Sequence, residues 1–248
     1  MKYLYFFGII NGNMLPKRLV IILLLSVATS SMYQGELYAA PSNGTRFPSK
    51  GSLEAGYEYN VILRRSIERS YGNLKSGNHF YTVSMGIYDW LSFDGKAGVG
   101  TVIQKGGGHL PKIDYNAGFA GGYGFRIKAF DDEKRGIRVI LGAQHICVHP
   151  QVRSIDDDKY ESILDDWQVS GLVSKSFKFL TTYAGIKGSD CEIIYNINNH
   201  DKKRRYSRYH IGLITGLELY LFNDKIRANI EARFFDETAF STAVCYLF

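Results

Sequence analysis

Cysteine and proline are both scarce in this sequence, which has 3 cysteines and 5 prolines among 248 residues. An odd number of cysteines gives no complete disulfide framework. Cys147, Cys191 and Cys245 form neither a CxxC pair nor a His/Cys cluster with metal-ligand spacing. We therefore expect no metal and no other cofactor, and we expect the three thiols to act as packing residues. One pair could still oxidise in an export compartment, and the sequence does not say which.

Linkers are missing as well, because no Pro/Ser-rich segment, low-complexity run or long repeat interrupts residues 50–248. A phosphate-binding loop is also absent. The segment "QKGGGHLPK" at 104–112 lacks the Gly-Lys-Ser/Thr ending that such a loop needs. We predict a single domain over residues 51–248, with residues 40–50 as a short polar leader.

Long apolar runs are limited to the N-terminus. Lys17 and Arg18 precede an apolar run at 19–28, and small and polar residues follow it, as in a cleavable secretory signal peptide. The run is too short for a spanning helix, which needs about 20 residues. We predict a signal peptide over residues 1–39, cleaved after Ala39. The alternatives are cleavage after Ala40 or near Ser30, translation from Met14 instead of Met1, and a retained N-terminal anchor.

A strong net charge is also absent. The formal net charge is +6, and removing residues 1–39 takes away three basic residues and one acidic residue, which leaves +4. This weakly basic balance does not indicate a nucleic-acid partner, and an exported protein would rarely meet one.

Aromatic residues and glycine, by contrast, are abundant, with 14% aromatic residues and 26 glycines. This composition favours many strands and tight turns over a helical bundle. Apolar and polar residues alternate with a period of two in ten segments, of which 179–188 is the least regular. The ten segments are 53–61, 80–87, 93–103, 114–128, 137–144, 167–174, 179–188, 208–221, 226–234 and 240–248.

Short turns and long loops alternate between these segments, and both chain ends fall on the side of the short turns. Outer-membrane β-barrels have this layout, with aromatic residues at both membrane interfaces. Trp167 and Phe177 are spaced for such a crossing, since a tilted strand spans a bilayer in about 9–11 residues. The long loops are 65–78, 104–113, 149–164 and 189–205. The outward aromatic residues near them are Tyr81, Tyr115, Trp167, Tyr209, Phe234 and Phe240.

We therefore predict an all-β fold: a transmembrane antiparallel up-and-down β-barrel of about ten strands, with eight or twelve strands as alternatives. A soluble β-sandwich or a periplasmic ligand-binding barrel would alternate in the same way. Two features favour the membrane barrel. The outward rows are long and nearly free of charge, and the opposite rows are rich in glycine and in residues that can form ion pairs.

The C-terminal segment alternates apolar residues up to a terminal aromatic residue. These residues are Phe240, Val244, Tyr246 and Phe248, with Thr242 as a polar exception. The segment resembles the insertion signal of bacterial outer-membrane proteins, and residues 51–248 are similar in architecture to small OmpA/opacity-type barrels. The resemblance implies a location in a Gram-negative outer membrane, contact with its lipids, and assembly by the barrel-assembly machinery. We expect a monomer.

The inward rows carry charges of both signs, and a barrel of eight to ten strands is nearly filled by its own side chains. Because buried charges persist only when they are paired, we predict an ion-pair network across the lumen. Its expected members are Glu54, Glu58, Arg126, Arg138, Arg208, Glu218, Arg227, Glu231 and Arg233.

A basic run in the last long loop predicts contact with the phosphates of lipopolysaccharide or with another anionic ligand, and an ordinary charged loop is the alternative. The run consists of Lys202, Lys203, Arg204 and Arg205.

Catalytic arrangements are not evident. Omptin proteases are also ten-stranded barrels, but their chemistry needs an Asp–His dyad, and no Asp-x-His pair occurs near His200 or His210. Ser207 and His210 are three residues apart on a predicted strand and so point to opposite faces, which argues against a Ser–His dyad. We predict no enzymatic activity and a structural or surface-interaction role through the long loops. A narrow, mildly anion-favouring pore and an outer-membrane protease or lipid-modifying enzyme are the alternatives.

Overall fold

The structure, a computed structural model, describes residues 44–69, 71–107, 111–198, 200 and 202–248. The predicted signal peptide and its cleavage site lie outside the described residues. All regular elements in these ranges are β-strands, and no helix among them has the length and hydropathy to cross a membrane. The strands are β1 (Leu53–Ser66), β2 (Asn73–Tyr88), β3 (Leu91–Lys105), β4 (Ile113–Asp114), β5 (Asn116–Asp132), β6 (Ile137–Gln151), β7 (Arg153–Ile155), β8 (Asp158–Ser176), β9 (Leu180–Ile197), β10 (Lys203–Tyr206), β11 (Ile211–Leu221), β12 (Ile226–Phe234) and β13 (Glu237–Leu247).

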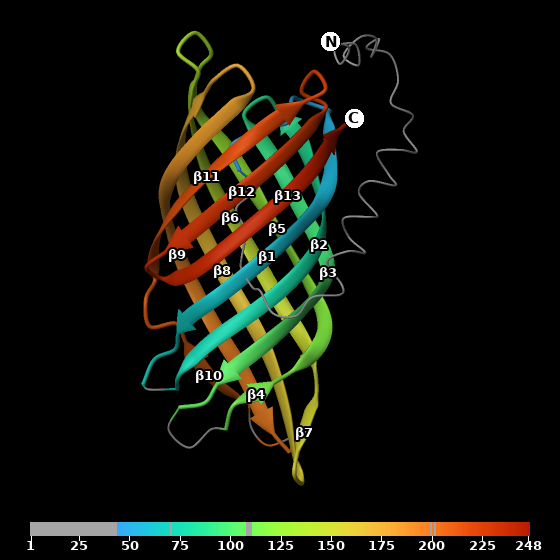
Figure 1. Cartoon of the computed structure of the whole chain (residues 1–248), viewed down its shortest axis with the longest axis vertical. Helices are drawn as coiled ribbons and strands as arrows, with labels where there is room; N and C mark the ends of the chain where they lie inside the picture. The colour runs from blue at the N-terminus through green and yellow to red at the C-terminus, as the bar shows by residue number, and fades with distance from the viewer. Residues whose placement is uncertain (1–43, 70, 108–110, 199, 201) are drawn as a thin grey trace, which may run out of the picture. The chain divides into compact units, whose positions relative to one another are not determined.

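Ten of these strands form one closed antiparallel ring (Figure 1). Its order is β1–β2–β3–β5–β6–β8–β9–β11–β12–β13, and β13 pairs with β1 to close it. Neighbours in the ring are consecutive long strands, so the connectivity is up-and-down. The predicted ten-stranded barrel is confirmed, and all ten predicted segments lie within these strands or overlap them.

Short turns connect the strands at the end of the ring that holds the C-terminus. They fall after β2, β5, β8 and β11, and Phe248 N donates a hydrogen bond to Leu53 O there. At the opposite end, β12 and β13 form a short hairpin, whereas β6, β8 and β9 run much further. The short strands β4, β7 and β10 extend the sheet at that far end (Figure 1). We call this far part, which consists of β4, β7, β10 and the ends of the long strands beyond the β12–β13 hairpin, the outer extension. The rest of the barrel is called the ring.

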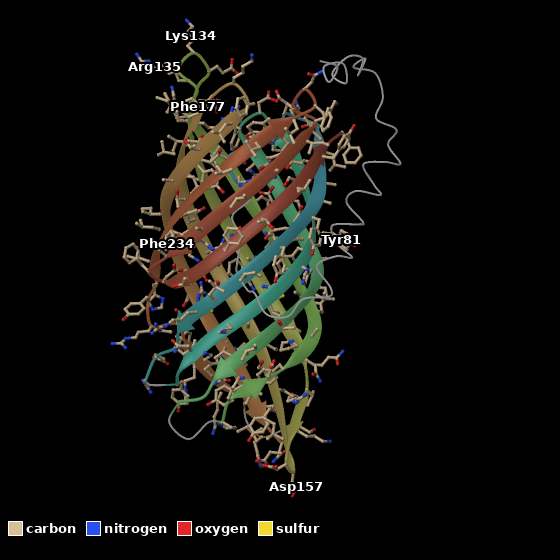
Figure 2. The ribbon with its side chains drawn as sticks, in the orientation of Figure 1. Tyr81, Lys134, Arg135, Asp157, Phe177 and Phe234 are labelled. Carbon is tan, nitrogen blue, oxygen red and sulfur yellow. The ribbon has the colours of Figure 1, made fainter. Side chains whose placement is uncertain are left out.

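The exterior of the ring is apolar. Exposed large apolar residues there include Val83, Phe125, Val169, Ile186 and Ile230. Figure 2 shows Tyr81 and Phe234 at one level of the barrel and Phe177 towards the short-turn end. Exposed aromatic residues therefore stand at two levels, as the sequence predicted for a membrane-crossing barrel.

The strands continue past this exterior into segments that the sequence pattern predicted as loops. β8 begins at Asp158 and β9 ends at Ile197, so most of 149–164 and 189–197 is regular sheet. Tyr115 also differs from its prediction as an outward belt residue, because it is 2% exposed and packs inside the outer extension. The interior of the extension is apolar, so an aromatic side chain there points inward. In the predicted membrane barrel, an aromatic side chain points outward to the lipid.

Candidate functional site

Segment 44–48, part of the predicted polar leader, lies inside the short-turn end of the ring. Glu218 accepts hydrogen bonds from the backbone N of Thr45 at 3.1 Å and from its hydroxyl at 2.9 Å. Arg126 Nη1 donates to the carbonyl of Arg46 at 2.5 Å, and Arg138 donates to the carbonyl of Thr45 at 3.4 Å. Thr45 is 1% exposed. The chain thus closes its own barrel from the short-turn side. This contact joins segments far apart in the sequence, and no local sequence pattern predicts it.

Ion pairs surround this segment. Arg227 contacts both Glu54 and Glu218, the latter at 3.2 Å, and Arg46 lies 3.5 Å from Glu54. Arg126 binds Asp94 through two hydrogen bonds of 2.7 and 2.8 Å. Further along the interior, Lys96 lies 3.2 Å from Glu58. All these side chains except the half-buried Arg46 are buried, and each charge has a partner of opposite sign.

A second cluster of buried charges fills the interior beneath the β12–β13 hairpin. Arg65 lies 2.6 Å from both Asp166 and Glu237, and Lys187 lies 2.9 Å from Asp236. Arg233 joins the cluster, 2.6 Å from Glu231 and 2.9 Å from Glu237. The side chains of this cluster are at most 4% exposed. Two successive layers of paired charges therefore occupy the ring.

The predicted lumen residues mostly lie where the sequence placed them, inside the ring. Arg138 is half-buried near the short turns, where it lies 3.0 Å from Asp131. The prediction that Arg208 points into the lumen is wrong. Arg208 precedes β11 and is exposed, and its guanidinium lies over the ring of Tyr209. The regular alternation of β11 begins only at Ile211, so extending that alternation backwards to Arg208 was wrong.

Five members of the second cluster were missed, and one of them, Asp166, lies at the point where β8 leaves the predicted loop 149–164. Arg65 was placed in the predicted loop 65–78, but β1 continues to Ser66. A β-bulge between Ile62 and Arg64 shifts the phase of β1, so that Arg65 points inward while Arg64 is exposed. Lys187 lies in the segment with the least regular alternation. Asp236 lies in the β12–β13 turn and Glu237 is the first residue of β13, at a connection that the sequence treats as solvated.

The predicted insertion residues Phe240, Val244, Tyr246 and Phe248 lie on the outer face of β13 and at its end. Phe248 is 65% exposed and Phe240 is 39% exposed. Cys245, between them, points inward and is 3.4 Å from Arg227. All three cysteines are free thiols, and Cys191 and Cys245 are buried.

The basic run is partly engaged in local contacts. Arg204 lies 2.8 Å from Glu192 across the β9–β10 pair, and Arg205 donates to the Tyr71 hydroxyl at 2.8 Å. Lys202 and Lys203 are exposed. The run is therefore an edge strand of the outer extension and not a free loop.

The acidic and histidine residues considered for catalysis are dispersed. Asp165 and Asp166 are adjacent on β8 and point to opposite faces: Asp165 lies 3.1 Å from His145 on the exterior, and Asp166 pairs with Arg65 inside. His210 Nδ1 lies 3.1 Å from the carbonyl of Ser189, and Ser207 donates to the carbonyl of Tyr209. Asp157 is at the tip of the outer extension (Figure 2). Among the described residues, no group of three His, Cys, Asp or Glu side chains is placed to hold a metal ion.

The interior of the outer extension is apolar. Its cluster of buried residues includes Leu74, Phe80, Tyr160, Leu164 and Ile193. Burial raises the pKa of Tyr115 in this cluster to about 12, since the phenolate would be poorly solvated there. The lumen is thus occupied along its length: by segment 44–48, by two layers of ion pairs, and by this apolar cluster.

An open groove of about 780 Å³ lies on the outside, where the β1–β2 connection meets the segment between β10 and β11. Ile67 pairs with Ser207, and Arg208 N donates to Ser66 O at 2.8 Å, so the sheet closes above the short β12–β13 hairpin. The charged residues that line the groove are Arg64, Glu68, Arg69 and Arg208, and His210 lines it as well.

Comparisons with known proteins concern the fold alone. No protein-family model matches the sequence, and no curated protein matches it. Among solved structures, the outer-membrane protease OmpT from Escherichia coli is similar, with a TM-score of 0.43 and 10% identity over 83% of this chain and 97% of that chain. Ail, the attachment invasion locus protein of Yersinia pestis, gives a TM-score of 0.40 and 9% identity over 82% of this chain and 100% of that chain.

The transport unit of the autotransporter AIDA-I from Escherichia coli gives a TM-score of 0.39 and 13% identity over 90% of this chain and 97% of that chain. Likenesses this distant carry no argument about activity. The closed ring, its apolar exterior and its charged interior are properties of this chain itself. The fold is that of a small outer-membrane β-barrel.

Proposed function

We propose that this protein resides in the outer membrane as a closed barrel that anchors the outer extension at the cell surface for interaction with the surroundings. The observation that carries the proposal is the occupied lumen. A barrel meant for conduction keeps an aqueous path, whereas this interior is filled with paired charges, an internal chain segment and an apolar cluster. What remains for function is the part of the protein that the ring holds outside the membrane.

The ring and the extension fit this division of roles. Exposed apolar residues cover the ring, which suits lipid, while the extension has its own buried core and can hold a shape in water. The outward row of Phe240, Val244, Tyr246 and Phe248 supports insertion by the barrel-assembly machinery. The closed ring leaves no unpaired strand edge that would require a second copy, in keeping with a monomer.

Thiol labelling of intact cells tests the orientation. Figure 2 places Asp157 and Lys134 at opposite ends of the barrel. In a Cys147→Ser background, which removes the one thiol that is not buried, we expect a membrane-impermeant maleimide to label Asp157→Cys on whole cells. Lys134→Cys should be labelled only after the cells are lysed. Labelling of Lys134→Cys alone, or of both variants equally, would contradict the proposed display.

Planar-bilayer recording tests the closed lumen. We expect the purified full-length protein to show no conductance steps above background. Regular steps would instead support the narrow pore, and a mild preference for anions among them would match the anion-favouring pore that the sequence leaves as an alternative.

A further inference from the structure

The basic groove described above has the composition of an anion site. Three arginines, Arg64, Arg69 and Arg208, line it together with His210 and a single carboxylate, Glu68. Glu68 is half-buried and lies 3.9 Å from Arg69, whose side chain is 76% exposed, so this long contact neutralises little of the local charge. Within the described residues, neither Arg64 nor Arg208 has a carboxylate partner. The buried charges of the ring are paired, whereas this groove keeps a net positive charge.

The backbone holds the cationic side chains in place from two distant parts of the chain. Arg64 comes from the outer end of β1, and its Nε donates to Asn73 at 3.2 Å, across the β1–β2 connection. Arg208 follows the Ile67–Ser207 bridge. His210 is fixed by its Nδ1 contact with the carbonyl of Ser189. The arginines therefore do not belong to one flexible loop but converge across a closed seam of the sheet.

The groove lies beside the apolar exterior of the ring. Tyr209 and Ile211, which flank His210 in sequence, are 48% and 73% exposed, and Phe235 in the β12–β13 turn is 73% exposed. Phe234, next to Phe235, stands at the same level as Tyr81 on the barrel (Figure 2). At the edge of a bilayer, acyl chains contact such apolar side chains, and the headgroup phosphates lie immediately outside them.

From this juxtaposition we infer that the groove binds the phosphate of a lipid headgroup in the outer leaflet. Arginine suits the role because its planar guanidinium binds phosphate oxygens through two parallel hydrogen bonds. The lipid chains would lie against Ile211 and Phe235 while the phosphate enters between Arg64 and Arg208. A soluble phosphate compound would use the same cations but would gain nothing from the apolar neighbours.

This inference deepens the proposed function and rests on it, because it needs the groove to face the outer leaflet. The two can fail separately. Thiol labelling of cells reports the orientation, whereas binding by the purified full-length protein reports the groove.

The test compares two triple variants with the same change of charge. Arg64→Gln/Arg69→Gln/Arg208→Gln removes the cations of the groove, and Lys202→Gln/Lys203→Gln/Arg204→Gln removes three cations from the neighbouring basic run. Both sets are exposed, and heat-modifiable gel migration checks that both variants are folded. The probes are lipid A with its phosphates, dephosphorylated lipid A, and inorganic pyrophosphate as a competitor, each with the protein in neutral detergent micelles.

We expect the groove variant to bind phosphorylated lipid A at least tenfold more weakly than the unchanged protein. The basic-run variant should bind within about twofold of it. That result would also contradict the contact with lipopolysaccharide phosphates that the sequence predicts for the basic run. Dephosphorylated lipid A should bind the unchanged protein as weakly as phosphorylated lipid A binds the groove variant.

Three results would overturn the inference. Equal losses in the two variants would mean a diffuse charge effect or a site in the basic run. Equal binding of dephosphorylated lipid A would mean that the groove does not recognise phosphate. Pyrophosphate binding as tight as that of the lipid would assign the groove to a soluble anion instead.

Discussion

The ring and the outer extension share the same long strands, but different residues point inward in each. The inward residues are mostly polar or charged in the ring and mostly apolar in the extension. On β8, the inward row reads Tyr160, Ser162 and Leu164 in the extension, then Asp166 and Gln168 in the ring. The outward row of the same strand changes at the same point in the reverse sense. It reads Lys159, Glu161, Ile163 and Asp165 in the extension, with one apolar residue among three charged ones, then Trp167 and Val169 in the ring.

β9 shows the same reversal next to it. Lys187 and Ser189 point inward in the ring, and Cys191, Ile193 and Tyr195 point inward in the extension. In the outer-membrane location proposed above, the cause is the medium outside the sheet, because lipid requires an apolar exterior whereas water requires a polar one. On β8 and β9 the alternation keeps its period of two across the boundary. The apolar residues change from the outer face in the ring to the inner face in the extension.

The largest expected effect comes from placing a charge in the apolar interior of the extension. Ile193 is fully buried opposite Leu164, and Ile194 beside it faces outward. Ile193→Asp should destabilise the extension by more than about 4 kcal/mol, because the carboxylate would be buried in the apolar cluster and the guanidinium opposite it, that of Arg205, is already bonded to Tyr71. Limited proteolysis should then cut the extension while the ring keeps its heat-modifiable migration. Ile194→Asp is the matched control, and equal sensitivity in both variants would contradict a distinct apolar core.

The next effect tests the charged interior of the ring. Arg65→Leu would leave Asp166, Asp236 and Glu237 with one cation fewer and should cost about 3–5 kcal/mol. Arg64→Leu, one residue away on the exposed side of the bulge, should cost less than about 0.5 kcal/mol. Urea unfolding of the refolded barrels measures both values. Similar midpoints for the two variants would mean that the bulge does not set which arginine points inward.

A smaller effect is expected where the chain closes its own barrel. Glu218→Gln weakens the charge-assisted hydrogen bonds that hold Thr45 and should loosen segment 44–48 by about 1.5–3 kcal/mol. Hydrogen exchange at the amide of Thr45 should become faster, with little change in the strands. Glu133→Gln, at an exposed turn, serves as the control. Unchanged protection in Glu218→Gln would show that other contacts hold the segment.

The smallest effect concerns a charge pair at the water-facing edge of the ring. Burial alone would raise the pKa of Asp131, but the hydrogen bond and charge of Arg138, followed by those of Lys128, hold it below its ordinary value. A lowered folded-state pKa stabilises the protein above the unfolded-state pKa, and this contribution is lost as the pH falls through the folded-state pKa. Between neutral and acidic pH, the free energy of unfolding should fall less in Asp131→Asn than in the unchanged protein, by under about 1 kcal/mol. Urea unfolding at several pH values measures it. An identical pH profile in the two proteins would show that the Asp131–Arg138 pair does not contribute to the stability of the barrel.

Much of the ring was predictable because its residues obey a local rule. Glu58, Arg126, Arg227 and Glu231 alternate with apolar residues along their own strands, so strand phase alone places them inside. The rule failed wherever the phase or the medium changes. Arg65 lies beyond the bulge in β1 and fell in a predicted loop, and the reversal at Asp166 made the outer ends of β8 and β9 resemble polar loops. The groove was invisible because its arginines come from segments more than a hundred residues apart.

The sequence by itself favoured an up-and-down barrel of about ten strands, with eight or twelve as alternatives, because period-two alternation and turn spacing are local properties of each strand. It also determined which end carries the short turns. The tertiary structure alone decided what fills the barrel and what stands above it. Segment 44–48 binds Glu218, Arg65 binds Glu237, and Ile67 pairs with Ser207 only once the ring has closed, since each contact joins residues that lie far apart in the chain.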